Sequence, residues 1–489
     1  MRLRMNTTIE VTWRASACCI AAAVFLSACV QVPKLDTSAP RAPGSFDSTR
    51  SFAAPRGDWP TSAWWQGYHD EQLDKLISEA LTKAPTLAQA GARLREAEYR
   101  AGLAQANRLP NVNLNASVTE EKLTYKGIFP QNAVPKGWND MGRVTLDFSW
   151  ELDFWGKNRA AFDAAVSEVR AGEAEDAAAR VLLTTSVAQA YVQLQNLFLQ
   201  RDLAQESVRN RTESEHLVRR RVAEGLEAQA TLEQASARLS QAIAERAAAE
   251  ESILLARNAL AALIGQGPDR GLDIQPTTLL NRQPFGLPDA LSADLIGRKP
   301  EVVAARWHVE AAAKRIGVAK TAFYPNVNLV AFIGFDALNL SRLGSSGSDT
   351  GAIGPALHLP IFDAGRLRAN YGAANAQYDA AVAMYDATLT QALRETADAA
   401  RSLQSLDVRL ANTQAALASS EKAYRLAKRR YEEGIADFQS VLTTEDAVLQ
   451  IRQSETALRA RGVSLDIALI KALGGGFATN PQTMAKVTP

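Results

Sequence analysis

The residue types that most often carry out chemistry in proteins are few in this chain and lie far apart. Its four histidines, His69, His216, His308 and His358, have no metal-ligand spacing, and all three cysteines fall within the first 29 positions. A disulfide framework and a cysteine-based metal site in the body of the chain are therefore excluded. No phosphate-binding loop or nucleophile arrangement stands out. We expect no catalytic residue, no cofactor, no metal and no enzyme activity.

One cysteine does indicate a specific modification. Cys29 closes the run Leu26-Ser27-Ala28-Cys29, which follows a basic start and a short apolar stretch. This order looks like a bacterial lipobox, in which the cysteine thiol is acylated and becomes the first mature residue. A plain signal peptide with an incidental cysteine is the alternative. We expect residues 1–28 to be a lipoprotein signal peptide and Cys29 to carry the lipid.

The residues after Cys29 bear on where the chain is exported. Val30 follows the cysteine, whereas an Asp at that position would suggest retention at the inner membrane. The stretch 29–62 is rich in Pro, Ser, Ala and Thr, which is the composition of a tether rather than of a core. The sequence therefore predicts a lipid-anchored protein of the cell outer membrane.

The charge balance of the chain is close to zero. Lys and Arg number 54 against 53 Asp and Glu, and removal of residues 1–28 leaves 51 against 52. A nucleic-acid-binding protein usually shows a basic excess or patch, so we expect no nucleic acid partner. The 47% hydrophobic and 22% charged residues indicate an ordinary folded protein. Beyond the N-terminus, no run of 18 apolar residues predicts a transmembrane helix.

The chain contains an internal duplication. Five markers occur twice in the same order, 209–215 residues apart, which chance does not explain. The markers pair 109–114 with 324–329, Ala84-Pro85 with Lys299-Pro300, Gly156 with Gly365, Gly225 with Gly434, and 262–265 with 472–475. The predicted division is a first structural repeat at 63–264, an equatorial linker at 265–287, a second repeat at 288–475 and a C-terminal tail at 476–489.

Each repeat is expected to begin with a helix and a β-hairpin. The helices are predicted at 71–107 and about 288–322, the hairpins at 111–155 and 326–362, and the single strands at 111–119, 144–154, 326–336 and about 352–362. From Val144 to Phe154, every second residue is apolar, which is the pattern of a strand with one apolar and one polar face. Each strand has about the 9–11 residues that cross a membrane when tilted.

The helices that follow each hairpin are predicted to be unusually long. From Lys157 to about Val222 there is no Pro and a single Gly, which allows roughly 100 Å of helix. Apolar residues then recur at steps of three and four, as in a coiled coil. These steps run through Ala249, Ile253, Ala256, Leu260 and Leu263, and through Leu403, Leu406, Leu410, Thr413 and Leu417.

Four membrane-length strands cannot close a barrel by themselves, because an open edge in lipid leaves backbone groups unpaired. Three chains would supply twelve strands and also twelve long helical segments. The predicted fold class is therefore an α+β membrane protein, in which a 12-stranded trimeric β-barrel continues into a long α-helical coiled-coil barrel, with internal duplication. The alternative is a non-channel coiled-coil envelope lipoprotein with a soluble β-subdomain.

The order of these motifs resembles the TolC-like outer membrane efflux protein family, in its lipid-anchored NodT/OprM-type branch. The similarity covers about 60–475, and its strength lies in the order and spacing of the motifs rather than in any one of them. The matching motifs are Trp64-Trp65 with Leu73, Leu76 and Ile77; Trp150-Glu151-Leu152-Asp153 before Gly156-Lys157; Lys299-Pro300-Glu301-Val302; Phe323-Tyr324-Pro325; and Arg430-Tyr431 with Gly434.

This resemblance implies a homotrimer in outer membrane lipid with a long periplasmic extension. It also implies that the channel passively conducts small molecules, such as drugs and toxic compounds, which an inner-membrane efflux pump delivers through a periplasmic adaptor protein. A conduit for whole proteins in type I secretion would reuse the same fold and is the first alternative. A periplasmic adaptor lipoprotein would need one helical hairpin and a lipoyl-like domain, which the duplicated plan does not favour.

Two glycines interrupt the long helices directly after basic clusters. Gly225 and Gly434 are placed where a helix C-terminus favours Gly, with cations complementing the helix dipole. The family resemblance implies that these turns form the periplasmic tips that contact the adaptor. The expected contact residues are Arg221, Gly225, Leu226, Arg430, Tyr431, Gly434 and Ile435.

Two further groups of residues are candidates for a gate and for the channel lumen. In similar channels, acidic residues just beyond the second glycine narrow the closed tip, but this chain has Ser440 and Thr443 at the matching positions. Asp437 is the nearest acidic candidate, with a solvated helix face as the alternative. Asp147, Glu151 and Asp153 share the polar face of the predicted strand and would line a cation-favouring barrel, unless Asp153 instead pairs with Lys157 or Arg159. The exported substrate does not follow from the sequence.

Overall fold

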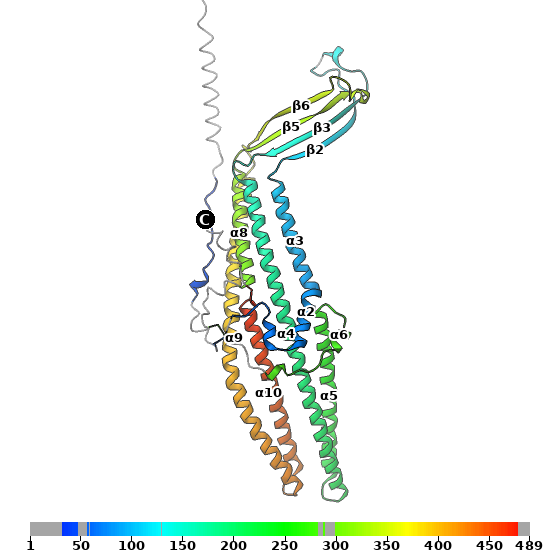
Figure 1. Cartoon of the computed structure of the whole chain (residues 1–489), viewed down its shortest axis with the longest axis vertical. Coiled ribbons are helices and arrows are strands. Elements are labelled where there is room, and N and C mark those ends of the chain that lie inside the picture. Colours follow the sequence, from blue (N-terminus) through cyan, green and yellow to red (C-terminus); the bar gives the residue numbers. More distant parts are fainter. Residues whose placement is uncertain are drawn as a thin grey trace, which may run out of the picture. The chain divides into compact units, whose positions relative to one another are not determined.

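The computed structural model describes residues 32–46, 56–57, 59–128, 130–281, 287–288 and 299–477 (Figure 1). The predicted signal peptide, Cys29, residues 289–298 of the second leading helix and the tail beyond 477 lie outside these ranges. The chain divides into two compact units. The first comprises Met1–Ala39, Arg95–Arg170 and Arg306–Ala383, and the second comprises Pro40–Leu94, Ala171–Ala305 and Met384–Pro489.

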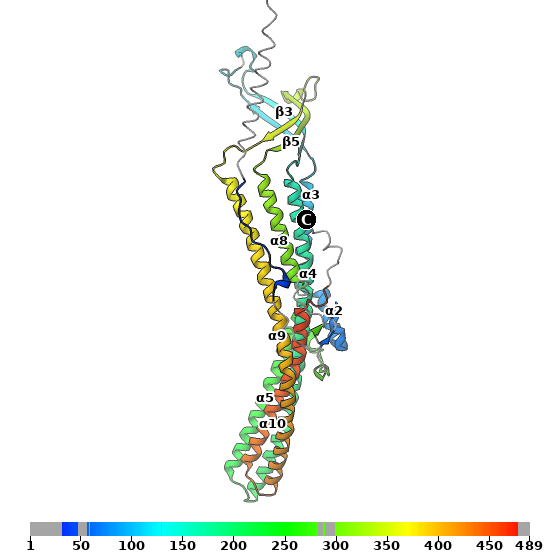
Figure 2. The same cartoon turned by 90° about the vertical axis from the view of Figure 1, so that its left-hand side faces the viewer.

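The first unit contains a four-stranded antiparallel sheet in the order β2-β3-β5-β6 (Figure 1), and the four strands in two hairpins were predicted. Its strands are β2 (Asn111–Glu121), β3 (Asn139–Glu151), β5 (Asn326–Leu338) and β6 (Asp349–His358). Each repeat supplies one hairpin, and β3 pairs with β5 to join the two hairpins. The hairpin loops lie at the end of the sheet away from helices α3 (Pro85–Ala106) and α8 (Pro300–Thr321) (Figures 1 and 2).

The predicted strand limits were wrong at both ends of β3 and β6, and they stopped two residues short of the ends of β2 and β5. β3 begins at Asn139 rather than 144, because Asp140 is held at the loop end, where its backbone carbonyl accepts from the N–H of Asn339 at 2.7 Å. β3 ends at Glu151 rather than 154, because the next polar residue, Asp153, turns to the first amides of α4. β6 ends at His358, so the predicted positions at 359–362 lie beyond the sheet.

The sheet has one continuous apolar face. Directly paired residues lie on the same face, and Leu114 pairs with Leu146, which in turn pairs with Ile333. Side chains on this face are open to solvent in the single chain: Leu114 is 71% exposed, Ile333 68% and Ile353 78%. The opposite face carries polar residues such as Asp147. The alternation read from the sequence therefore matches the two faces of the sheet.

The first leading helix is in fact two helices, so the prediction of one helix over 71–107 was wrong. α2 (Glu71–Lys83) and α3 (Pro85–Ala106) are separated at Ala84, whose ψ of 125° is extended rather than helical. Proline disfavours the helical conformation of the residue before it, and Pro85 starts a new helix instead. Asp70 begins α2, because its side chain accepts from the N–H groups of Gln72 and Leu73.

The remaining helices repeat with equal lengths in the two halves. α3 and α8 have 22 residues each, α4 and α9 have 67, and α5 and α10 have 35. Their bounds are α4 (Lys157–Ala223), α5 (Gln229–Leu263), α8 (Pro300–Thr321), α9 (Arg366–Glu432) and α10 (Phe438–Ala472). These lengths support the internal duplication that the sequence markers indicated. Within the described residues, no helix combines the length and the apolar character that a bilayer crossing requires.

Short elements connect these helices in the second unit. α6 (Asp269–Leu272) follows α5, and β1 (Arg56–Gly57) pairs in parallel with β4 (Leu287–Pro288). The main core of this unit joins side chains of α2, α4, α5 and α10. Its largest fully buried members include Leu76, Tyr191, Phe198, Leu260 and Ile264. The three-and-four stripes predicted a packed side for the long helices, and Ile253, Leu260, Leu403 and Leu406 are indeed buried.

Candidate functional site

The polar face of the sheet is built around Asp147 in the middle of β3. Its Oδ2 accepts a hydrogen bond from Asn115 Nδ2 at 2.6 Å and another from Thr145 Oγ1 at 2.8 Å. Both donors are neutral, so neither hydrogen bond brings an opposite charge to the carboxylate. The strand register brings Asn113 and Phe332 directly opposite Asp147 on the two neighbouring strands.

Two further charges on this face, Arg143 and Glu151, have neighbours of opposite sign. Arg143 lies 3.7 Å from Asp336, and its guanidinium lies 5.2 Å from the ring centre of Phe332. Glu151 pairs with Lys157 at 3.0 Å and also accepts from Asn326 Nδ2 at 2.9 Å. Of the two predicted wall carboxylates on β3, Glu151 therefore has a cationic partner, whereas the hydrogen-bond donors to Asp147 are neutral.

Asp153 does not share the strand face on which the sequence pattern placed it. Its two carboxylate oxygens accept from the backbone N–H groups of Asn158 at 3.2 Å and of Arg159 at 2.8 Å. These are unpaired donors of the first turn of α4, and a negative charge there is favoured by the helix dipole. Asp153 is thus a helix cap rather than a residue of the sheet wall.

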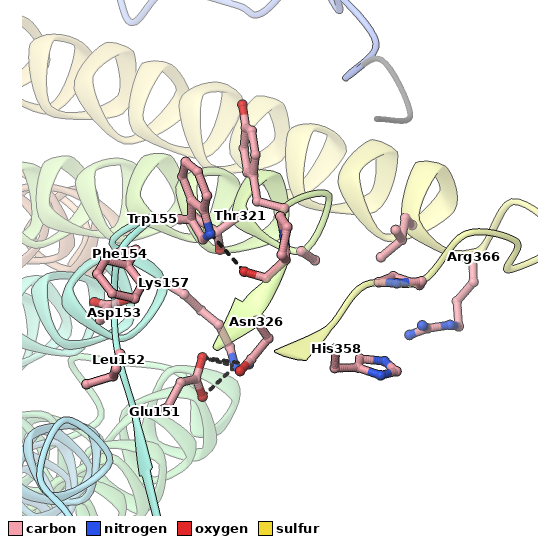
Figure 3. Close-up of a pocket in the computed structure, with 15 residues that line it drawn as sticks. Glu151, Leu152, Asp153, Phe154, Trp155, Lys157, Thr321, Asn326, His358 and Arg366 are labelled. Atoms are coloured by element: carbon pink, nitrogen blue, oxygen red, sulfur yellow. Dashed lines mark hydrogen bonds and ion pairs between the residues drawn. The ribbon is translucent and has the colours of Figure 1, made fainter. Parts of the chain in front are cut away.

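A pocket of about 190 Å³ lies where the sheet meets the helices of the first unit (Figure 3). Trp155 stacks on Tyr324 with 4.9 Å between ring centres, and its Nε1 donates to the Pro325 carbonyl at 2.8 Å. The lining contains Lys157 and Arg366 as well as the acidic Glu151 and Asp153. The lining therefore carries charges of both signs.

The first helical tip, in the second unit, lies between α4 and α5. Gly225 has a φ of 73°, which is the left-handed conformation that glycine adopts without strain. Its N–H donates to the Val222 carbonyl, and the N–H of Leu226 donates to the Arg221 carbonyl at 2.8 Å. These two bonds form a Schellman motif, which satisfies the last helical carbonyls. Leu226 projects from this turn and is 62% exposed.

The second tip, between α9 and α10, repeats the first in detail. Gly434 has a φ of 76°, and the N–H of Ile435 donates to the Arg430 carbonyl at 2.8 Å. Ile435 is 63% exposed. The two glycines therefore lie at the helix ends where the sequence predicted them. An apolar side chain leaves each turn at the equivalent position.

Arg221 and Tyr431 join the two tips. The guanidinium of Arg221 donates to the Tyr431 carbonyl at 3.2 Å and lies 4.9 Å from the centre of its ring. The Tyr431 hydroxyl donates to Glu227 at 3.2 Å, and burial together with this carboxylate raises the pKa of Tyr431 to about 12. Tyr431 is only 2% exposed, so it supports the tips from inside rather than lining their surface.

The three gate candidates all lie at the start of α10. Asp437 accepts from the backbone N–H of Ser440 at 2.9 Å and from its hydroxyl at 2.5 Å. These hydrogen bonds lower the pKa of Asp437, which is the N-cap of α10. Thr443 lies one turn further on, and its hydroxyl donates to the Gln439 carbonyl at 2.9 Å. All three candidates are exposed, so they are accessible to a neighbouring chain or to solutes.

The sequence did not reveal a buried charged cluster between α4 and α10. Arg211 is 5% exposed and donates to Asp446 at 2.8 Å and to the Arg238 carbonyl at 3.1 Å. Glu445 is 2% exposed, and neither of its carboxylate oxygens has a hydrogen-bond partner among the described residues. Burial raises the pKa of Glu445. The adjacent acids were visible in the sequence, but only packing decides which of them is buried.

A family model described as outer membrane efflux protein matches this chain at residues 76–266 and 291–475. The two matched stretches correspond to the two halves of the duplication. Among solved structures, the outer membrane protein VceC of Vibrio cholerae is 43% identical, with a TM-score of 0.80, and the match covers 86% of this chain and all of that chain. The outer-membrane channel OprN is 29% identical, with a TM-score of 0.82, over 91% of this chain and 99% of that chain.

Two curated relatives are resistance proteins. The multidrug resistance outer membrane protein MdtP of Shigella flexneri is 30% identical over 438 residues, which cover 88% of this chain and 89% of MdtP. The fusaric acid resistance protein FusA of Burkholderia cepacia is 39% identical over 322 residues, or 65% of this chain and 60% of FusA. Long helices, four antiparallel strands and internal duplication are thus the fold of outer membrane channels rather than of enzymes, and this chain belongs to the outer membrane efflux protein family.

Proposed function

We propose that three copies of this chain form one outer membrane channel, which passively exports small molecules that an inner-membrane pump delivers through a periplasmic adaptor. The observation that carries the proposal is the exposed apolar face of the four-stranded sheet. Leu114, Ile333 and Ile353 expose more than two thirds of their area on one continuous face. A monomeric soluble protein rarely leaves such a face uncovered, whereas lipid covers it without cost.

The edges of the sheet support an assembly of several chains. β2 and β6 are the outer strands, and each has a row of backbone groups that no described strand pairs. In lipid, an unpaired backbone group costs several kcal/mol, so the edges must be closed by further strands. Four strands are too few for a barrel, and three chains would supply twelve. We infer that β6 of one chain pairs with β2 of the next.

The family supports the location of the chain, and the names of two relatives support the proposed cargo. Membership of the outer membrane efflux protein family places the chain in the outer membrane. The names of MdtP and FusA refer to multidrug and fusaric acid resistance, which supports export of small toxic compounds by this chain as well. We propose that acylated Cys29 adds a lipid anchor, and that the two repeats at 63–264 and 288–475 supply equivalent parts of the wall.

The helical tips are proposed as the contact with the adaptor. Leu226 and Ile435 each project from a tight turn, are exposed, and occupy equivalent positions in the two repeats. Arg221 and Tyr431 would hold the two turns at a fixed spacing. Asp437, Ser440 and Thr443 follow the second tip and are proposed to narrow the entrance, whereas Asp147 and Glu151 are proposed to face the lumen of the barrel.

The test combines an oligomer mass with a conductance measurement. The mature protein, extracted in detergent, is expected to have the mass of three chains and to produce discrete conductance steps in planar bilayers. A trimer that stays silent until its tip is truncated would still support the barrel with a closed entrance. A monomer without conductance would contradict the proposal and favour the alternative, a non-channel envelope lipoprotein.

A matched pair of variants tests which face of the sheet meets lipid. Ile333→Arg puts a charge on the apolar face near the middle of β5, where burial in a bilayer would cost about 2–4 kcal/mol. Ser149→Arg adds the same side chain to the opposite face. We expect Ile333→Arg to lower the amount of trimer recovered from the outer membrane, and Ser149→Arg to leave it unchanged. Equal recovery of the two variants would contradict a lipid-facing Ile333.

A further inference from the structure

The segment after Cys29, which links the proposed lipid anchor to the body of the protein, contacts α9 through Ser38 and Arg41. In the first unit, the backbone N–H of Ser38 donates to Oδ1 of Asp379 at 2.9 Å. In the second unit, the backbone N–H of Arg41 donates to Oδ1 of Asp386 at 3.1 Å, and its Nε lies 3.7 Å from the other carboxylate oxygen. We propose that Asp379 and Asp386 are a docking strip, which holds this segment as a strap and sets the position of the lipid anchor.

The spacing of the two contacts fits an extended chain lying along a helix. Three residues separate Ser38 from Arg41, and an extended chain advances about 3.4 Å per residue, or roughly 10 Å in all. Seven residues separate Asp379 from Asp386, and a helix advances about 1.5 Å per residue, which is also roughly 10 Å. Residues seven apart lie on the same side of a helix. The two aspartates therefore have the register that an extended strap requires.

The type of contact explains how the strap is held in one register. Each aspartate accepts from a backbone N–H, so the contact depends on the position of the strap backbone rather than on a mobile side chain. Such hydrogen bonds to a carboxylate are stronger than those between neutral groups. The Arg41 side chain is 65% exposed, and its ion pair with Asp386 is a weak addition.

The direction of the strap leads back toward the sheet. Residue numbers rise together along the strap and along α9, so the chain before Ser38 runs toward the start of α9 at Arg366. Thirteen residues of helix separate Arg366 from Asp379, or roughly 20 Å. Nine residues separate Cys29 from Ser38, and they span at most about 30 Å. An acyl group on Cys29 can therefore reach the sheet end of α9 while the strap stays docked.

This inference rests on the proposed lipid anchor, but the docking itself can be tested without it. The strap offers trypsin two sites, after Lys34 and after Arg41. In full-length protein with Cys29→Ser behind a signal peptide that does not direct lipidation, we expect Asp379→Ala/Asp386→Ala to speed cleavage after Arg41 by about tenfold or more, because proteolysis follows local opening. The matched control is Asp407→Ala, which removes an exposed aspartate elsewhere on α9.

An introduced disulfide provides a second test of docking, which does not depend on access of the protease. Without Cys29, the mature chain has no cysteine, so an introduced pair is unambiguous. Ser38→Cys with Asp379→Cys is expected to form a disulfide on mild oxidation, and Ser38→Cys with Asp407→Cys is not. Equal trypsin cleavage of the parent and the double alanine variant, or no disulfide in the first pair, would overturn the docking strip.

A shortened strap tests the link between docking and the anchor. Deletion of residues 30–34 leaves three residues between Cys29 and Ser38. The four steps along the chain then span at most about 14 Å and fall short of the roughly 20 Å to the sheet end of α9. In membranes, we expect trypsin to cleave the acylated deletion variant after Arg41 more quickly than the acylated parent. In the Cys29→Ser form of the deletion variant, we expect the site after Arg41 to stay protected from trypsin. If Arg41 is protected from trypsin in both forms, docking does not set the position of the anchor. A failure of the proposed channel function would not change this comparison of trypsin cleavage.

Discussion

The hydroxyl of Tyr68 donates a 2.5 Å hydrogen bond to Oδ2 of Asp466, although 398 positions separate the two residues in the chain. Asp466 is fully buried in α10, and Tyr68 ends the short 3-10 helix at Trp64–Tyr68. Burial, reinforced by Asp466, raises the pKa of Tyr68 well above its usual value. The bond joins the segment before α2 to the last long helix, and so connects the two ends of the second unit.

Tyr68→Phe is expected to destabilise the second unit. The variant keeps the ring in the core but removes one partner of a buried carboxylate, which costs about 1–3 kcal/mol. Thermal unfolding of the detergent-extracted protein measures the loss. Tyr99→Phe is the control, because Tyr99 is 78% exposed on α3 and its hydroxyl should matter little. A Tyr68→Phe variant as stable as Tyr99→Phe would show that the bond contributes nothing to folding.

Glu445→Gln is expected to stabilise the protein at neutral pH. Burial raises the folded-state pKa of Glu445, so folding favours the protonated form and the ionised form is penalised. The penalty is absent below the unfolded pKa, near 4.5, and complete above the folded pKa, so the variant gains stability only as pH rises through that window. The expected gain at pH 7 is on the order of 1 kcal/mol, because the neutral amide avoids the ionisation penalty and a pKa difference of one unit corresponds to about 1.4 kcal/mol.

Asp446→Asn is the matched control for Glu445, because it changes the neighbouring acid that does have a partner. Asp446 receives a 2.8 Å hydrogen bond from the buried Arg211, so its neutralisation should destabilise the protein at neutral pH. Chemical denaturation of both variants at pH 4 and pH 7 separates the two effects. The same sign for both variants at pH 7 would contradict the assignment of Glu445 as the unsatisfied carboxylate.

Leu226→Asp with Ile435→Asp is expected to weaken adaptor binding without changing stability. Both side chains are exposed at the tips, so an acidic replacement disturbs no core packing. If they are the apolar contacts of the adaptor, loss of both should reduce affinity at least about tenfold, as for central interface residues. Affinity for the purified adaptor and drug resistance of cells measure the effect. Leu254→Asp, at an exposed position of α5 away from the tips, is the control.

Asp147→Asn is expected to reduce the preference of the open channel for cations. Asp147 accepts hydrogen bonds from the neutral donors Asn115 and Thr145, whereas Glu151 is paired with the cation Lys157. Three copies would place three carboxylates at one height of the barrel. The reversal potential in a salt gradient reports the change, and Ser149→Ala on the same face is the control. An unchanged reversal potential in Asp147→Asn would place the selectivity elsewhere.

Much of the fold could be read from local patterns. The alternation through Val144, Leu146 and Phe148 identified a strand with two unlike faces, because side chains alternate at every residue of a strand. The repeated Gly225 and Gly434 identified two helix ends, because the left-handed turn there favours glycine. The repeat of about 210 residues indicated a duplicated plan, and α4 and α9 indeed have 67 residues each. Each of these signals depends on a few neighbouring residues.

The errors came from competition between neighbouring elements. The helical pattern continued through Ala84, but Pro85 cannot continue the first helix and starts another. The strand pattern continued through Asp153, but the unpaired amides at the start of α4 offered its carboxylate a better partner. In both places, the periodic pattern predicted the correct type of element. The residue at which the element ends was set by Pro85 in the helix and by capping of α4 in the strand.

The sequence by itself determined the strand faces, the tip glycines, the duplication and the family resemblance, because these depend on residue type and spacing along the chain. Only the tertiary structure decided which charges are compensated and which are buried. The structure shows that Glu151 pairs with Lys157 and that Glu445 and Asp466 are buried. It also shows that Ser38 and Arg41 contact α9. The spacing of these residues in the sequence gives no sign of these contacts. Burial and pairing depend on how distant helices pack, and no local pattern of residues encodes that packing.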